Sequence, residues 1–180
     1  GLGRTGRFFA FEHAGIEPDA IGMAKGLGGG VPIGGVWVSD RYAGLFKPGS
    51  HGTTFGGTPL ISAAALTVIE TIEDEGLLEN VIDNGTYVMQ RLSELKSKFP
   101  HYISDVRGLG FMIGIQIAES PAEVVTQLRD NGLIVPPAGS NVIRFMPALT
   151  AMKDDFDEAL GIFESVVENR TSTLPKTQGA

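Results

Sequence analysis

The sequence has no cysteine, no long apolar run and no excess of basic residues, and each absence excludes a class of protein. Without cysteine, a disulfide scaffold is excluded. No stretch approaches the roughly 18 consecutive apolar residues of a membrane-spanning helix. A net charge of −7 argues against nucleic-acid binding, which normally requires a basic surface. Apolar residues make up 42% of the 180 residues, which excludes disorder and provides a core for one domain or two small ones.

Several catalytic motifs are also missing. The three histidines are scattered, so they do not indicate a clustered metal site. Neither a phosphate-binding P-loop nor a hydrolase nucleophile elbow occurs. The spacing of Gly1, Gly3 and Gly6 matches a dinucleotide-binding fingerprint, but no strand precedes it and no acidic residue follows at the required distance. The sequence therefore does not predict a dinucleotide site there.

Glycine is abundant and unevenly placed. The chain has 25 glycines in 180 residues, about twice the usual share, and sixteen of them lie within residues 1–57. Seventeen of the 21 acidic residues lie in 58–180. The first segment is therefore interpreted as a region in which the backbone packs closely around a small group. The second is interpreted as an acidic, helix-rich surface.

Alternating strand and helix patterns predict an α/β fold class. Short apolar runs predict strands at 20–24 and 33–39 within a larger parallel sheet, and Pro59 opens a helix that continues to about residue 72. From Leu77, apolar residues at three-four spacing predict a long amphipathic helix that ends before Pro100. Further on, the patterns predict strands at 102–106, 111–117, 133–135 and 142–145, helices at 121–131 and 153–168, and Gly132 as a left-handed helix end.

Lys25 is the main single-residue candidate for catalysis. It lies between the apolar run 20–24 and the glycine-rich segment 26–30, far in sequence from other charges. Such a lysine is expected to be partly desolvated, which lowers its pKa and favours the free amine. A free amine can attack a carbonyl carbon and form a Schiff base, as pyridoxal phosphate (PLP) enzymes require. Local physics equally allows a lysine that extends from a surface turn into water.

Two other segments carry groups suited to binding anions. Segment 49–57 places Thr53 and Thr54 between glycines, where hydroxyls and backbone amides can donate to a phosphate, although a plain turn has the same composition. Arg144 lies on an otherwise apolar strand, where its guanidinium needs a carboxylate. That carboxylate can belong to a substrate or to an acidic side chain of the protein.

Taken in order, six segments make the sequence resemble the class III PLP-dependent aminotransferases. They are Gly-Leu-Gly-Arg-Thr-Gly (1–6), Ala-Lys-Gly-Leu-Gly-Gly-Gly-Val-Pro-Ile-Gly (24–34), Lys-Pro-Gly-Ser-His-Gly-Thr-Thr-Phe-Gly-Gly (47–57), Val-Arg-Gly-Leu-Gly (106–110), Leu-Arg-Asp-Asn-Gly-Leu (128–133) and Asn-Val-Ile-Arg-Phe (141–145). The resemblance implies the PLP-dependent transferase fold type I. On that basis we expect the end of the large PLP-binding domain at 1–75, a connecting helix at 76–98, a small C-terminal α/β domain at 99–170 and a loose tail at 171–180.

The resemblance also implies roles for four residues. Lys25 matches the lysine that binds PLP covalently and moves a proton between the substrate carbon and the cofactor. Thr54 matches the threonine that reaches the phosphate of the PLP held by the partner subunit of a homodimer. Thr53 matches a hydroxyl residue beside the substrate, and Arg144 matches an arginine on the substrate side of the site. No metal, nucleic acid or membrane is expected to take part.

The implied activity is amino-group transfer from N-acetylornithine to 2-oxoglutarate, a cytoplasmic step of arginine biosynthesis. Ornithine, succinylornithine and 4-aminobutyrate are alternative amino donors, and a catalytically silent α/β interaction module is the alternative outside enzymes. In the family, an Asp-Glu-x-Gln run, whose aspartate pairs with the pyridine nitrogen, comes just before the segment that matches 1–6. We therefore expect the chain to be the C-terminal part of a longer enzyme and to be inactive alone. An N-terminal targeting signal cannot be judged from this start.

Overall fold

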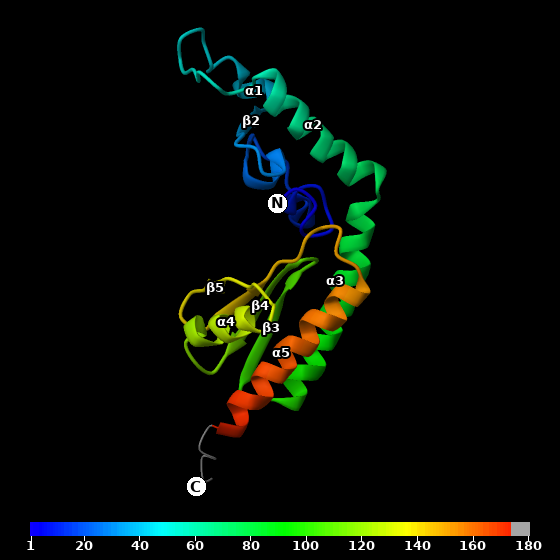
Figure 1. Cartoon of the computed structure of the whole chain (residues 1–180). Coiled ribbons are helices and arrows are strands. Elements are labelled where there is room, and N and C mark those ends of the chain that lie inside the picture. The colour runs from blue at the N-terminus through cyan, green and yellow to red at the C-terminus, as the bar shows by residue number, and fades with distance from the viewer. Residues whose placement is uncertain (174–180) are drawn as a thin grey trace. The chain divides into compact units, whose positions relative to one another are not determined.

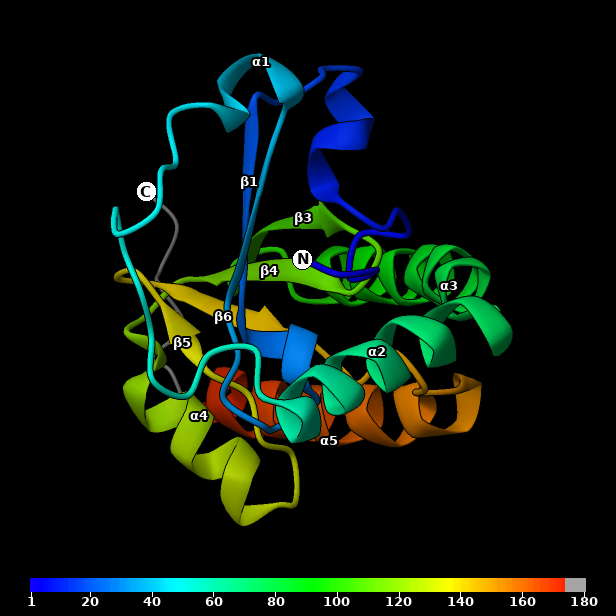
Figure 2. The same ribbon diagram turned by 90° about the horizontal axis from the view of Figure 1, so that it is seen from above.

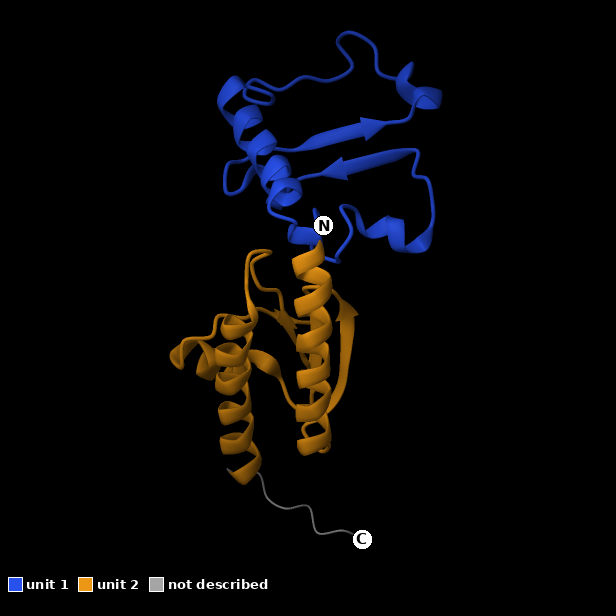
Figure 3. Cartoon of the chain, turned by 90° about the vertical axis from the view of Figure 1, so that its right-hand side faces the viewer, with its two compact units in different colours: residues 1–78 blue, residues 79–180 orange. Residues whose placement is uncertain are grey.

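The computed structural model describes residues 1–173, and the chain divides after Leu78 into two compact units (Figures 1 and 3). Both units combine helices with strands. Among the described residues, no helix has both the length and the apolar content needed to cross a membrane.

The first unit is built from short elements and one long helix. Its strands pair antiparallel, with Ala20 opposite Val38 and Met23 opposite Gly35. Pro59 is the first residue of its long helix, as predicted from the fixed φ angle of proline. The elements are the 3-10 helices η1 (Ala10–Ala14) and η2 (Lys25–Gly28), the strands β1 (Ala20–Met23) and β2 (Gly35–Val38), and the α-helices α1 (Asp40–Ala43) and α2 (Pro59–Asp74).

The pairing of β1 with β2 differs from the prediction of a larger parallel sheet. The two strands form a two-stranded antiparallel sheet. The connection from Ala24 to Gly34 contains only a single 3-10 turn. Parallel neighbours need a crossover of about a dozen residues or more, usually containing a helix, so this short connection favours antiparallel pairing.

The second unit contains a four-stranded antiparallel sheet with the order β3-β4-β6-β5, which can be followed in Figure 2. Its strands are β3 (Ile103–Leu109), β4 (Met112–Ile117), β5 (Pro137–Ala138) and β6 (Val142–Phe145). Its helices are α3 (Leu77–Lys98), which begins just before the division, α4 (Pro121–Asp130) and α5 (Lys153–Thr173).

The core of the second unit lies between one face of this sheet and the three helices. Alternate residues of β4 are buried, because successive side chains of a strand point to opposite faces. Helices α3 and α5 run side by side (Figure 1), joined by the ion pair of Lys98 with Glu164. The buried cluster includes Val88 and Leu92 of α3, Val124 and Leu128 of α4, Ile113, Ile115 and Ile117 of β4, and Phe156 and Phe163 of α5. The opposite face of the sheet carries Asp105, Arg107, Gln116 and Arg144.

Helix α3 begins and ends as the apolar periodicity predicts, and its buried apolar residues from Val81 onward belong to the core of the second unit. The assignment of 1–75, 76–98 and 99–170 to a large domain, a connecting helix and a small domain stays a prediction.

Two predicted elements of the second unit are wrong. Residues 133–135 form no strand, and β5 lies at Pro137–Ala138. The two prolines at 136 and 137 lack the N–H that a strand ladder requires, so pairing is limited to a short edge. The last helix continues to Thr173, beyond the predicted end at 168, so the expected tail begins inside α5. Thr171 and Ser172 are helical, and their hydroxyls bond to carbonyls of the preceding turn, as Ser and Thr can do inside a helix. The remainder of that tail, 174–180, lies outside the described residues.

The end of α4 follows the prediction. Gly132 has a φ of +98°, a left-handed conformation that glycine adopts without a Cβ clash. Its N–H donates to the carbonyl of Arg129 at 3.0 Å, and the N–H of Leu133 donates to that of Leu128 at 2.8 Å. These bonds satisfy two carbonyls at the helix end.

Candidate active site

Lys25 is held in an uncommon backbone conformation at the end of β1. It directly follows Ala24 and begins η2, with a φ of +54°. Among the described residues, Leu2 is the one other non-glycine residue with a positive φ. The left-handed region costs an L-residue with a Cβ roughly 1–2 kcal/mol, and such outliers cluster at functional sites. A glycine would fit this backbone better, so a lysine here runs against the local backbone preference.

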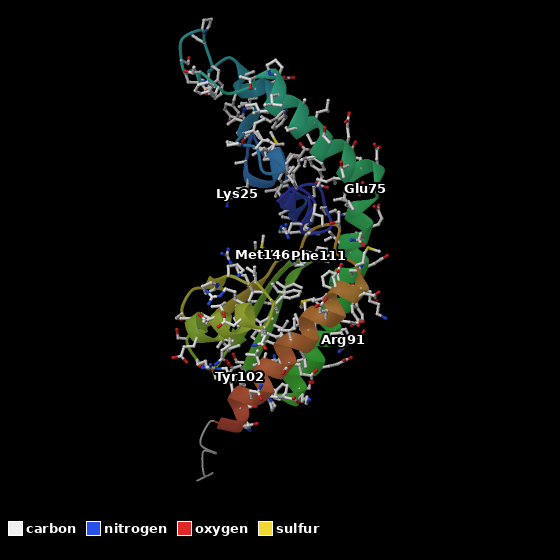
Figure 4. All side chains as sticks on the ribbon, in the orientation of Figure 1. Lys25, Glu75, Arg91, Tyr102, Phe111 and Met146 are labelled. Atoms are coloured by element: carbon white, nitrogen blue, oxygen red, sulfur yellow. The ribbon has the colours of Figure 1, made fainter. Side chains whose placement is uncertain are left out.

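The side chain of Lys25 is exposed and points away from the ribbon (Figure 4). The predicted partial desolvation is therefore wrong for this chain taken by itself. The cause is that Lys25 lies beyond the end of a two-stranded sheet, where no described element covers it. Within the described part of the chain, its amine has no hydrogen bond or ion pair, so it is accessible to a reactant.

The glycines that follow Lys25 pack this segment against the protein itself. A Cβ at Gly28 would lie 2.8 Å from Cγ2 of Ile33, and a Cβ at Gly29 would lie 2.9 Å from Cγ2 of Val68 on α2. Both distances are shorter than real Cβ contacts. At these two positions, glycine allows the backbone to approach the protein's own side chains, which fixes the backbone immediately after Lys25.

An apolar cavity of about 720 Å³ adjoins the end of β1. Glycine backbone and small apolar side chains of both strands form much of its wall, and the loop after α1 contributes one aromatic ring and one imidazole. Its lining includes Met23, Ala24, Gly35, Val38, Phe46 and His51. Since Ala24 precedes Lys25 in the chain, the backbone of the lysine lies beside this cavity.

The loop 49–57 presents two hydroxyls to solvent. Thr53 and Thr54 are both exposed. The N–H of Gly56 donates to Oγ1 of Thr53 at 3.1 Å, and a Cβ on Gly56 would lie only 2.2 Å from Cγ2 of Thr53. Glycine at 56 therefore allows the Thr53 side chain to keep this conformation. The Thr53 oxygen accepts in this bond, so its own proton remains available to a ligand.

Arg144 lies on β6 in the second unit, between the buried Ile143 and Phe145. Because strand residues alternate, its side chain projects from the sheet face opposite the core, and it is exposed. Among the described residues it forms no ion pair, so no acidic side chain there supplies the carboxylate that its guanidinium needs. A second arginine on the same face, Arg107, hydrogen-bonds Asp105 and thereby lowers the pKa of that carboxyl group.

The four predicted residues thus divide between the two units. Lys25, Thr53 and Thr54 belong to the first unit, and no hydrogen bond joins them among the described residues. Arg144 belongs to the second unit. Arg107 lies in the matching segment 106–110, but no role was predicted for it. Its two-residue spacing from Asp105 could have indicated a shared face, had the strand predicted at 102–106 been extended to include it.

A lysine at the end of a strand, a glycine-rich segment and a hydroxyl-bearing loop define a site typical of PLP-dependent transferases. The family Aminotransferase class-III matches residues 1–167. The chain belongs to the class III aminotransferases, a PLP-dependent family, as the resemblance predicted.

Curated relatives carry a more specific name. The chain is 43% identical over 168 residues to the acetylornithine aminotransferase of Streptococcus mutans, covering 93% of this chain and 44% of the relative. It is 46% identical over 165 residues to that of Thermosynechococcus vestitus, covering 89% of this chain and 40% of the relative. The chain therefore spans less than half the length of these relatives.

Solved structures confirm the predicted fold. The acetylornithine aminotransferase from Elizabethkingia anophelis has a TM-score of 0.87 at 30% identity, over 94% of this chain and 45% of that one. The ornithine aminotransferase from Toxoplasma gondii has a TM-score of 0.90 at 30% identity, over 97% of this chain and 42% of that one. A further structure of the Toxoplasma enzyme is described with partial occupancy of PLP at its active site.

Proposed function

We propose that this chain is part of an aminotransferase that uses PLP to move an amino group from N-acetylornithine to 2-oxoglutarate. The observation that carries the proposal is Lys25, an exposed lysine in the left-handed region at the end of a strand. The membership of the chain in the class III family supports the reaction class, and the names of the curated relatives support N-acetylornithine as the donor. The ornithine aminotransferases among the structural neighbours make ornithine the second candidate donor.

The groups on the first unit suit PLP. Bound PLP would supply an aldehyde for covalent attachment and a ring that withdraws electrons from the substrate. The amine of Lys25 would form the covalent bond, and the hydroxyl of Thr54 with nearby loop amides would donate to the phosphate. In a homodimer, which we propose on the resemblance, that phosphate belongs to the partner subunit.

The free amine of Lys25 would accept a proton from the substrate carbon that bears the nitrogen, and would return this proton at the next step. The proton of Thr53 remains free to bond the substrate, because its oxygen already accepts from Gly56. Arg144 would hold a substrate carboxylate with its planar fork. The amino acceptor, 2-oxoglutarate, takes the nitrogen in the second half of the reaction.

Covalent trapping tests the assignment of the lysine. In the complete protein loaded with PLP, borohydride reduction should attach the cofactor to Lys25, and peptide mapping locates it. Lys25→Ala should remove the adduct and lower turnover by several orders of magnitude. Lys47→Ala is a matched control, since it removes an exposed lysine of the same unit. An adduct on Lys47 or Lys153 would contradict the proposal.

Steady-state kinetics separate the donors. We expect a higher kcat/KM for N-acetylornithine than for ornithine or 4-aminobutyrate. A preference for either alternative would overturn the proposed donor but leave the aminotransferase assignment intact.

A further inference from the structure

The tripeptide Asp-Asn-Gly occurs twice in the sequence, at 83–85 and at 130–132. Because glycine has no Cβ, the backbone nitrogen that follows each asparagine is unhindered. Such a nitrogen can attack the side-chain carbonyl carbon of the asparagine before it. The reacting groups of the two copies are identical, so a difference in their reactivity must come from the fold.

The first copy lies in the interior of helix α3. Asn84 is half-buried, and its Nδ2 donates to Oδ1 of Asn80 at 2.8 Å. Nδ2 of Asn80 in turn donates to the carbonyl oxygen of Leu149 at 2.7 Å. Gly85 is buried, and a Cβ added there would lie 2.8 Å from Cα of Gly110. Rotation of the backbone at this copy therefore breaks α3 in its interior and separates it from the turn between β3 and β4.

The second copy lies where helix α4 ends. Asn131 and Gly132 are both exposed, and Gly132 has a φ of +98°. Nδ2 of Asn131 donates to the carbonyl oxygen of Gln127 at 2.8 Å, and the N–H of Gly132 donates to that of Arg129 at 3.0 Å. A Cβ at Gly132 would approach only Cδ1 of Ile162, at 4.0 Å. Only the last turn of a helix must open here, and helix ends open at little cost in free energy.

We propose that Asn131 is a site of spontaneous deamidation, whereas the fold protects Asn84. The backbone nitrogen of Gly132 loses its proton to hydroxide and forms a bond to Cγ of Asn131. The bond from Cγ to Nδ2 then breaks, and this nitrogen takes a proton from water and leaves as ammonia. Water opens the resulting cyclic imide at either carbonyl, which gives aspartate or isoaspartate at position 131. This inference does not depend on the proposed function.

The products alter the end of α4. A carboxylate at position 131 cannot donate to the carbonyl of Gln127, and a negative charge is unfavourable beside the free carbonyls of a helix C-terminus. Isoaspartate also adds one methylene to the main chain just before Gly132 and Leu133, whose N–H groups bond to the last carbonyls of the helix. We therefore expect the modified chain to open more often at this turn.

Peptide mapping of the complete, folded protein during incubation at mildly alkaline pH tests the proposal. Mass spectrometry follows the conversion of amide to acid in both tripeptides, and an isoaspartyl methyltransferase with S-adenosylmethionine detects isoaspartate. We expect Asn131 to react at least about tenfold faster than Asn84, because the rate follows the population of locally opened backbone. In urea that unfolds the chain, the two rates should converge.

Three results of this experiment would overturn the proposal. The first is equal rates for the two asparagines in the folded protein. The second is a difference that persists in urea, because the fold would then not be its cause. The third is reaction of both sites in urea without any conversion of Asn131 in the folded protein.

Variants assign the reaction and its effect to position 131. Asn131→Gln should remove most of the isoaspartate, because attack on the longer side chain requires a larger ring, and an undiminished level would overturn the site. Asn141→Gln is the matched control, since valine follows this asparagine. Asn131→Asp should speed amide exchange at Gly132 and Leu133 about two- to fivefold, and Asn141→Asp, which adds the same charge outside a helix end, should not. Unchanged exchange in Asn131→Asp would refute the effect on α4.

Discussion

Replacing Gly85 with alanine should destabilise the second unit although alanine is the better helix former. Gly85 is a buried residue inside α3, where it faces the turn between β3 and β4. A Cβ at this position would lie 2.8 Å from Cα of Gly110 and 3.0 Å from its carbonyl carbon and oxygen. All three contacts are with backbone, which cannot rotate away as a side chain could. The helix and the turn must therefore separate.

Two opposing effects set the magnitude. Glycine to alanine within a helix gains about 0.8–1 kcal/mol of intrinsic helix stability. Forcing an extra methyl into a packed contact typically costs about 1–3 kcal/mol. The cost falls at the upper part of that range here because the turn is itself constrained: a Cβ at Gly108 would lie 2.1 Å from the carbonyl oxygen of Met112. We expect Gly85→Ala to lower the free energy of unfolding by about 1–2 kcal/mol.

Gly161→Ala is the matched control, because Gly161 is an exposed glycine inside α5, and a Cβ added there would have no heavy atom of a neighbouring element within 4 Å. Gly161→Ala should raise the free energy of unfolding by about 0.5–1 kcal/mol, because alanine has the higher helix propensity and reduces the freedom of the unfolded chain. Urea unfolding followed by circular dichroism measures both changes, at an unchanged m-value. If both variants were stabilised equally, the close approach of α3 to the turn would be refuted.

Two further predictions concern charge and backbone strain. Arg170 and Tyr102 hold the pKa of Glu119 below its usual 4.5, so its carboxylate stabilises the folded state above that pH and loses the contribution as pH falls through the lowered pKa. Glu119→Gln should therefore flatten the loss of stability in urea unfolding as pH falls below the usual 4.5 of this carboxyl group, and an unchanged slope would contradict this. Lys25→Gly should be about 1 kcal/mol more stable than Lys25→Ala, because alanine keeps the unfavourable φ; equal thermal midpoints would refute the strain at this residue.

The elements that sequence analysis predicted correctly depend on local signals. The apolar spacing from Leu77 specifies a helix wherever it packs, and Pro59 and Gly132 act through their own φ angles. Such signals need no knowledge of distant residues. The family and the fold could also be predicted from the sequence, because the six matching segments occur in an order that is specific to the family.

The errors arise where a distant partner decides the outcome. Strand partners and register are not encoded by local patterns, so neither the antiparallel pairing of β1 with β2 nor the pairing of β4 with β3 and β6 could be predicted from the sequence. The exposure of Lys25 depends on what covers the end of β1, which flanking residues do not reveal. Val135 is apolar and buried, as the predicted strand required, yet the prolines that follow it prevent a ladder there.

Lys25 occupies a backbone conformation that suits glycine better than lysine. Its amine forms no hydrogen bond or ion pair among the described residues that would offset this cost. Backbone outliers of this kind cluster at functional sites, where the position of the side chain is needed for a ligand. The strain at Lys25 therefore supports the proposal that its amine is the group that binds the cofactor.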